Sequence, residues 1–95
     1  MTVLWTDNAI SHLIAIYDYI ARDSAFYAQR MIDRLTKRST QLADFPKSGR
    51  VVPEYEEEDI REVVEKPYRL IYRISPDRIE ILAVIHGAQR LPVEL

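Results

Sequence analysis

The sequence has 95 residues, which suits one domain (residues 1–95) with one modest hydrophobic core. Its hydrophobic fraction of 47% is typical of a globular protein, and the lack of cysteine excludes disulfides and cysteine-based metal sites or nucleophiles. The formal net charge of −2 argues against a molecule that binds polyanions over its whole surface. Without a signal peptide or an 18-residue apolar run, we expect a cytoplasmic protein with no membrane contact.

The N-terminal part predicts a strand followed by a helix. Thr2 to Trp5 is a short apolar run, and the three good N-cap residues Thr6, Asp7 and Asn8 come directly after it. At 100° per residue, one helix face collects Ile10, Leu13, Ile14, Tyr17, Ile20 and Ala21. Ile16 and Tyr19 lie at the edge of this stripe or beyond it. Either the helix is wedged between two parts of its own fold, or these two residues form an exposed apolar edge for a partner chain.

A second helix is predicted from Ala25 to Asp44, with Asp23 or Ser24 as its cap. Its apolar side holds Ala28, Met31, Ile32, Leu35 and Leu42, and its opposite side holds Arg30, Arg34, Lys37 and Arg38. The short break between the two helices predicts an antiparallel helical hairpin. The basic side is most simply a solvated face, and an acidic or nucleic-acid partner is the alternative reading.

After the helix end at Phe45-Pro46, the chain becomes extended over residues 50–53 and then strongly acidic. The segment Glu54–Asp59 carries five carboxylates in six residues, so we expect a solvated, mobile loop. No spacing in this run converges on one ion, and we predict no metal site and no cofactor. Ile60 to Glu65 then predicts a strand.

A β-hairpin follows, in which Tyr68–Ile74 and Arg78–His86 are joined by a turn at Ser75-Pro76-Asp77. Strict alternation places one set on the helix side: Leu70, Tyr72, Ile74, Ile79, Ile81, Ala83 and Ile85. The other face would hold Arg69, Ile71, Arg73, Glu80, Leu82, Val84 and His86. Exposed apolar residues on that face would be unusual in a stable monomer, so we expect a C-terminal segment, another subunit or a partner to cover it.

The fold class predicted from this order is α+β. An N-terminal strand and an antiparallel helical hairpin pack on one face of a small, mainly antiparallel sheet, in the order strand–helix–helix–strand–strand–strand. Tyr68 and Tyr72 are expected to pack in the core or the hairpin. His12, on the rim of the first helix, is expected to be structural or merely exposed.

Four segments in this order resemble the successive signatures of the RelE/ParE toxin superfamily of type II toxin–antitoxin systems: Gly49–Glu54, Ile60–Val63, Tyr68–Arg73 and Ile81–Gly87. The resemblance covers essentially the whole chain. It implies a cognate, ParD-like antitoxin that forms a hetero-oligomer with the toxin. The extended C-terminal region of the antitoxin would wrap around the toxin and neutralise it. The residues expected to contact the antitoxin are Ile16, Tyr19, Ile20, Met31, Ile71, Leu82 and Val84.

Two branches of the superfamily imply different activities. A RelE-like toxin cleaves mRNA inside the ribosome, and Arg69, His86 and Arg90 would then be the catalytic residues. However, the lysine positions of that branch fall on Ile60 and Glu62, and the sequence reaches Leu95 without the C-terminal basic or aromatic residue. A ribosome binder also needs cationic surface, whereas the preceding loop is acidic.

The ParE-like branch poisons DNA gyrase without being an enzyme, and it is the reading we favour. The target contacts would then be Arg61, Arg69, His86 and Arg90. A non-toxic module that only binds and regulates an antitoxin is the third hypothesis.

Simpler structural roles compete with these assignments. His86 is either a general acid or base with a pKa near neutrality, or a residue that bonds the backbone at the strand end. The arginines of the sheet could form cross-strand ion pairs with Glu62, Glu65 or Glu80, which is the reading we favour for Arg73.

Overall fold

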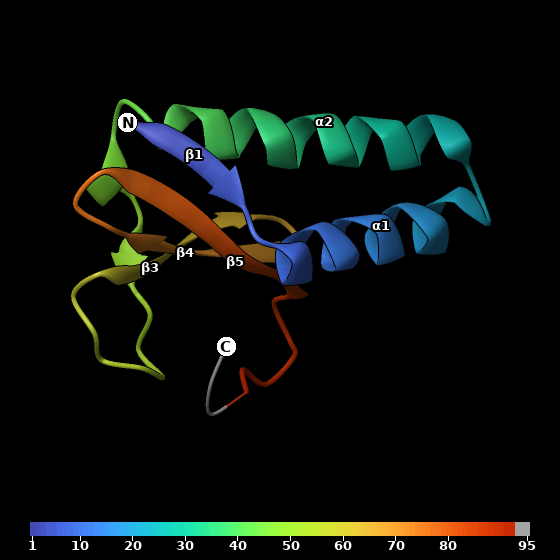
Figure 1. Ribbon diagram of the computed structural model, residues 1–95. Coiled ribbons are helices and arrows are strands. Elements are labelled where there is room, and N and C mark those ends of the chain that lie inside the picture. The colour runs from blue at the N-terminus through green and yellow to red at the C-terminus, as the bar shows by residue number, and fades with distance from the viewer. Residues whose placement is uncertain (93–95) are drawn as a thin grey trace.

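The computed structural model describes residues 1–92, so Leu95 lies outside the described part. A helical hairpin lies over one face of the sheet (Figure 1), which has five strands. The elements are β1 (Thr2–Trp5), α1 (Asp7–Ala21), α2 (Ala25–Gln41), the 3-10 helix η1 (Pro46–Ser48), β2 (Arg50–Val51), β3 (Ile60–Glu65), β4 (Tyr68–Ile74) and β5 (Arg78–His86). The strand order is β1-β5-β4-β3-β2; β1 runs parallel to β5 and the other neighbours are antiparallel. This confirms the predicted fold class, and the extended segment after residue 49 adds a short edge strand.

Both helices begin at the predicted caps. The Thr6 hydroxyl accepts a hydrogen bond from the Ala9 amide at 3.1 Å, and the Ser24 hydroxyl accepts one from the Tyr27 amide at 3.2 Å. Each bond satisfies one backbone donor that the first turn of a helix leaves open. Within the described residues, no helix is long and apolar enough to cross a membrane.

The buried face of α1 differs from the predicted one. Ile16 is buried at 8% exposure, whereas Ile10 and Ile14 are 42% and 57% exposed. Of the two alternatives for this stripe, the exposed edge is therefore wrong for Ile16. The reason is the small residue Ala9, which is fully buried and brings the line Ala9, Leu13, Ile16 and Ile20 against the core. Tyr19, at 68% exposure, is exposed as predicted.

A β-bulge at Leu82 reverses the alternation along β5. Ile71 pairs with Ala83 and Tyr72 pairs with Ile81, so Leu82 has no partner on β4. From this point on, residues that simple alternation assigned to one face lie on the other. The assignment of Ala83 and Ile85 to the helix side is wrong, and so is that of Val84 to the open face, because Val84 packs in the helix-side core.

The sheet therefore has a hydrophobic core on each face. The larger core lies under the helices and includes Leu35, Leu70, Tyr72, Ile79, Ile81 and Val84. The smaller core lies on the opposite face and consists of Val52, Ile60, Ile71, Ala83 and Ile85, with Tyr55 and Leu91 packed against it. The expected C-terminal cover is thus present, together with the loop after β2. Ile71, Leu82 and Val84 are 0%, 8% and 3% exposed, so the chain itself already covers these three residues.

Tyr72 joins the sheet to the segment that follows α2. Its side chain is fully buried, and its hydroxyl donates to the Pro46 carbonyl at 2.6 Å and accepts from the Gly49 amide at 3.0 Å. A Cβ atom on Gly49 would lie 2.5 Å from both the Tyr72 hydroxyl and the Glu62 carbonyl. Glycine is required here by close packing of the backbone, not by an unusual dihedral angle.

We expect Gly49→Ala to lower the free energy of unfolding by about 1–3 kcal/mol, because the added methyl group overpacks a buried site. Gly87→Ala is the matched control, since a Cβ atom there meets only the Pro67 carbonyl, at 3.2 Å. Urea denaturation of the two variants measures the difference. Equal losses in both variants would contradict the packing role of Gly49.

Candidate functional site

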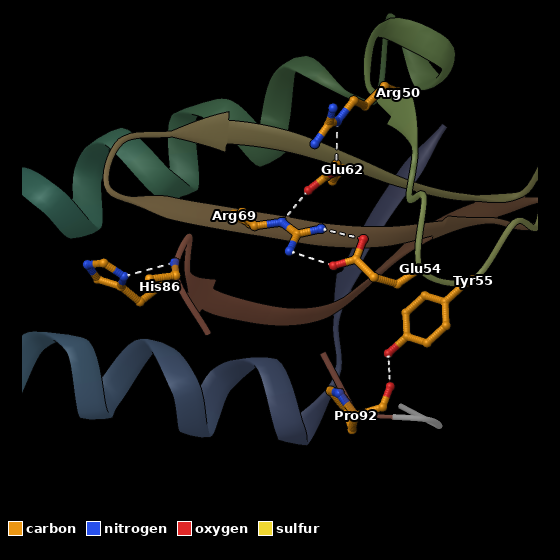
Figure 2. Close-up of polar contacts among 8 residues, drawn as sticks. Arg50, Glu54, Tyr55, Glu62, Arg69, His86 and Pro92 are labelled. Atoms are coloured by element: carbon orange, nitrogen blue, oxygen red, sulfur yellow. Dashed lines mark hydrogen bonds and ion pairs between the residues drawn. The ribbon is translucent and has the colours of Figure 1, made fainter. Parts of the chain in front are cut away.

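An ion network crosses the face of the sheet that lies away from the helices (Figure 2). The Glu62 carboxylate on β3 accepts hydrogen bonds from the Nε atoms of Arg50 on β2, at 2.8 Å, and of Arg69 on β4. The terminal nitrogens of Arg69 bind both carboxylate oxygens of Glu54, at 3.0 and 3.1 Å. The network therefore links three strands and the loop between β2 and β3.

These contacts commit the Arg69 guanidinium to protein carboxylates. Its side chain is only 11% exposed, and the Glu62 side chain is completely buried. The hydrogen bonds that Arg69 donates to Glu54 and then to Glu62 raise the pKa of Arg69, and the same bond to Glu54 lowers the pKa of that carboxyl group from its usual 4.5. Two arginines and two glutamates leave the cluster with no formal net charge. An anion from outside would have to displace Glu54 to reach Arg69.

The positions at which a RelE-like nuclease would carry lysines hold no cation. Ile60 is buried at 5% exposure in the smaller core, and Glu62 is the buried acid of the network. RNA cleavage by 2′-hydroxyl attack needs cations on the phosphate and groups that move protons. The site offers carboxylates and a neutralised arginine instead.

His86 has a structural hydrogen bond at the end of β5. Its Nδ1 atom accepts a hydrogen bond from the Ala88 amide at 3.2 Å. Its ring packs edge to face with the Tyr68 ring, with the ring centroids 5.9 Å apart. The imidazole is exposed. Tyr68 and Tyr72 are buried, as predicted.

The other predicted arginines are not gathered around His86. Arg61 neighbours Glu62 on β3 and points to the other face of the sheet, where it donates to the Gly49 carbonyl at 3.0 Å and pairs with Glu58. Arg90 is exposed and forms no hydrogen bond or ion pair with any residue that the structure describes. The expected ion pair of Arg73 is absent among residues 1–92. Glu80, opposite it, bonds Ser75 and lies 3.7 Å from Arg78.

The acidic loop is tied at two points, so the expectation of a fully solvated, mobile segment is wrong for its first part. Glu54 binds Arg69, and the Tyr55 hydroxyl donates to the Pro92 carbonyl at 2.6 Å (Figure 2). Tyr55 also packs on the smaller core, whereas Glu56, Glu57 and Glu58 are exposed. The loop and the C-terminal segment hold each other against the sheet.

A groove separates α1 from the end of β5. It has a volume of about 550 Å³, and its walls include Ile16, Tyr19, Tyr68, Val84 and His86. This groove therefore brings together three expected antitoxin contacts, Ile16, Tyr19 and Val84, and one expected target contact, His86. Ile20 and Met31 are half-buried and lie in a second hollow, beside α2.

Side chains of α1 complete the hydrogen bonding of β5 where β1 ends. The Asn8 amide donates to the Leu82 carbonyl at 2.9 Å, and the Nδ1 atom of His12 accepts from the Val84 amide at 3.1 Å. This confirms a structural role for His12. The sequence analysis treated Asn8 only as a possible cap and missed its hydrogen bond to β5. It also missed Glu54 as a partner of Arg69 and Arg50 as a partner of Glu62.

Comparisons with known proteins agree with this fold. The family model described as the ParE toxin of the type II toxin–antitoxin system parDE matches residues 3–91. Toxin RelE2 of Caulobacter vibrioides is 36% identical over 88 residues, which cover 92% of this chain and 96% of that protein. Putative toxin Y4kP of Sinorhizobium fredii is 37% identical over 92 residues, 95% of this chain and 92% of that one.

A solved structure is also similar. A chain of the chromosomal ParDE toxin–antitoxin system from P. aeruginosa superposes with a TM-score of 0.75 at 25% identity, covering 90% of this chain and 95% of that chain.

The ion pair between Glu54 and Arg69 predicts a specific loss of stability in acid. Because the folded-state pKa of Glu54 is lowered, its contribution is complete above pH 4.5 and is lost as the pH falls through the folded-state value. Glu54→Gln should cost about 0.5–1 kcal/mol at pH 7, since the carboxylate is 43% exposed. It should also weaken the pH dependence below 4.5.

Urea denaturation of both proteins between pH 3 and 7 measures this. Glu57→Gln is the control, because the exposed side chain of Glu57 forms no ion pair within residues 1–92. If Glu54→Gln keeps the wild-type pH profile, the ion pair does not contribute to stability.

Proposed function

The chain belongs to the ParE toxin family of type II toxin–antitoxin systems, and from this premise we propose that it inhibits DNA gyrase. In this proposal the protein acts by binding gyrase and blocking replication, without catalysing a reaction of its own. It acts in the cytoplasm, where gyrase works. A ParD-like antitoxin neutralises it by direct binding.

The observation that supports gyrase over the ribosome is the state of Arg69. A nuclease would need this guanidinium on a phosphate, but here it holds Glu62 and Glu54. The nearby positions 60 and 62 supply no cation. A binder of ribosomal RNA would also need surplus positive charge to displace counterions, whereas this chain carries a net charge of −2. These features fit a protein target better than an RNA substrate.

A RelE-like, ribosome-dependent endoribonuclease is the second candidate, because one relative with 36% identity is named Toxin RelE2. In that case Arg69, His86 and Arg90 are the candidate catalytic residues, and Arg69 must first leave Glu54. A non-toxic antitoxin-binding module is the third candidate, and its mark would be expression without growth arrest.

We assign the target contacts to the exposed residues Arg90 and His86. Arg61 and Arg69, which were also expected to contact the target, are held by Glu58 and by the buried network. They position the two ends of the acidic loop instead.

For the antitoxin, the accessible contacts are Tyr19, Ile20 and Met31, beside the two hollows at the end of α1. Ile16 and Val84 form the floor of the groove between α1 and β5, where an incoming apolar side chain can reach them. Ile71 and Leu82 are buried, so they act through packing. The antitoxin lies as a helix in this groove, because Asn8 and His12 already bond the part of β5 beyond β1 at which an added strand would have to pair.

The deciding experiment incubates purified protein with gyrase, ATP and supercoiled DNA, beside a translating ribosome extract. We expect stabilised gyrase–DNA cleavage complexes and intact mRNA. Arg90→Ala should reduce gyrase inhibition at least tenfold, because it removes an exposed cation at the proposed interface, and it should leave the melting temperature unchanged.

Arg78→Ala is the matched control, since Arg78 is exposed at the far end of β5. Cleavage of translated mRNA with no effect on gyrase would reject the proposal in favour of the nuclease. Full inhibition by Arg90→Ala would remove Arg90 from the target surface.

Tyr19→Asp should weaken antitoxin binding at least tenfold, because it places a charge in an apolar groove. Phe45→Asp is the control. Phe45 is 67% exposed, similar to Tyr19, but lies after α2 and outside this groove. Titration calorimetry with the product of the neighbouring gene measures both affinities. Equal affinities would exclude the end of α1 from the interface.

A further inference from the structure

The segment that follows β5 carries both proposed target contacts, and it is fixed at its beginning and at its end. At the beginning, the Gln89 amide donates to the His86 carbonyl at 2.9 Å, and the Gln89 side chain accepts from the His86 amide at 2.6 Å. The Gly87 amide donates to the carbonyl of Pro67, between β3 and β4, at 2.8 Å. These bonds close a turn over residues 86–89 and hold it against the sheet.

Two contacts fix the end of this segment. Leu91 is half-buried and packs on the smaller core, and the Pro92 carbonyl accepts the hydrogen bond of the Tyr55 hydroxyl at 2.6 Å (Figure 2). Arg90 lies between this end and the turn, and it is exposed. Because consecutive Cα atoms are only about 3.8 Å apart, the backbone of Arg90 has little freedom while both ends hold. Its guanidinium is therefore presented from a defined position.

Tyr55 is a suitable anchor because it is itself held. Its amide donates to the Val52 carbonyl at 3.2 Å, and its ring packs on the smaller core. The residue before it, Glu54, binds Arg69 through both carboxylate oxygens. Burial, and then the nearby Glu54 carboxylate, raise the pKa of Tyr55, so the hydroxyl keeps the proton that it donates to Pro92.

A continuous line of contacts thus runs from the buried ion network to the neighbour of Arg90. Arg69 holds Glu54, Glu54 precedes Tyr55 in the chain, and Tyr55 holds Pro92. Binding costs less conformational entropy when the interacting residue is already held in place. A residue that does not touch the target can therefore change the affinity for it through Arg90.

We propose that Tyr55 is a positioning residue of the target surface: its hydroxyl fixes Pro92 and thereby presents Arg90 to the protein target in one orientation. Tyr55 makes no contact with the target in this arrangement. The inference rests on the proposed function, because it takes gyrase as the target, and it adds the means by which the target surface is held. The acidic loop then contributes to inhibition through Tyr55 and not through its charges.

The first measurement is the concentration of toxin that inhibits gyrase supercoiling by half. Tyr55→Phe removes the hydroxyl but keeps the ring on the smaller core, so it should melt like the wild type. We expect about three- to tenfold weaker inhibition, because one end of the segment becomes free. In the double variant Tyr55→Phe/Arg90→Ala, inhibition should be no weaker than in Arg90→Ala alone, because no guanidinium is left to position.

The second measurement needs no gyrase. Magnetic resonance relaxation of the backbone amides gives the order parameter of Arg90, which is about 0.85 for a rigid backbone and below about 0.6 for a flexible one. We expect the rigid value in the wild type and the flexible value in Tyr55→Phe.

Tyr17→Phe is the matched control for both measurements. Tyr17 is half-buried, as Tyr55 is, but it lies on α1, and its hydroxyl forms no hydrogen bond within residues 1–92. This variant should inhibit gyrase like the wild type and keep Arg90 rigid. An equal loss in Tyr17→Phe and Tyr55→Phe would reduce the effect to a general loosening of the fold and overturn the inference.

Three further outcomes would overturn it. If Arg90 stays rigid in Tyr55→Phe, or is already flexible in the wild type, the hydroxyl does not fix the segment, whatever the protein does to gyrase. Unchanged inhibition by Tyr55→Phe would show that the position of Arg90 does not matter. Losses that add up in the double variant would mean that Tyr55 contacts the target itself. A wild type that leaves gyrase fully active would instead reject the proposed function, and this role of Tyr55 with it.

Discussion

The buried carboxylate of Glu62 is the constraint around which the open side of the sheet is organised. A charge with a completely buried side chain is tolerated only when cations and hydrogen bonds compensate for lost water, and here Arg50 and Arg69 supply both. Because the two arginines lie on different strands, the requirement fixes β2, β3 and β4 together. The Nε atom of Arg69 binds Glu62, so its two terminal nitrogens are free to bind Glu54. Through Glu54 they hold the loop between β2 and β3.

The same network also bears on function, because it occupies the guanidinium of Arg69. A guanidinium that faces a sheet surface is a ready anion site, and the fold places one at Arg69. Glu54 fills that site from within the chain, and Glu62 occupies a position at which a nuclease would carry a cation. Two acidic side chains therefore bind the guanidinium to which a phosphate could otherwise bind, and they do so without altering the strands.

Local patterns in the sequence were enough for the order of elements, the helix caps and the hairpin, because those depend on neighbouring residues. Faces were harder. The bulge at Leu82 cannot be read from alternation, since Ile81 to Ile85 is apolar throughout and fits either register. On α1 the width of the apolar stripe hid which part is buried, and the small residue Ala9 decided it. The cross-strand pair of Arg69 with Glu62 was among the predicted ion pairs. Its second partner, Glu54, escaped prediction, because Glu54 is fifteen positions away and belongs to a run of acids that look alike.

The groove between α1 and β5 and the hollow beside α2 meet at the last turns of α1. Tyr19 lines the hollow toward β5, and its neighbour Ile20 lines the hollow along α2. A partner helix that lies over the last turns of α1 would contact both hollows and would enter the groove that also contains His86. Neutralisation then needs no contact with the acidic loop or with the buried ion network. Binding in the groove beside β5 would cover His86, which belongs to the proposed target surface. Apolar burial at Tyr19 would then govern how long the complex lasts.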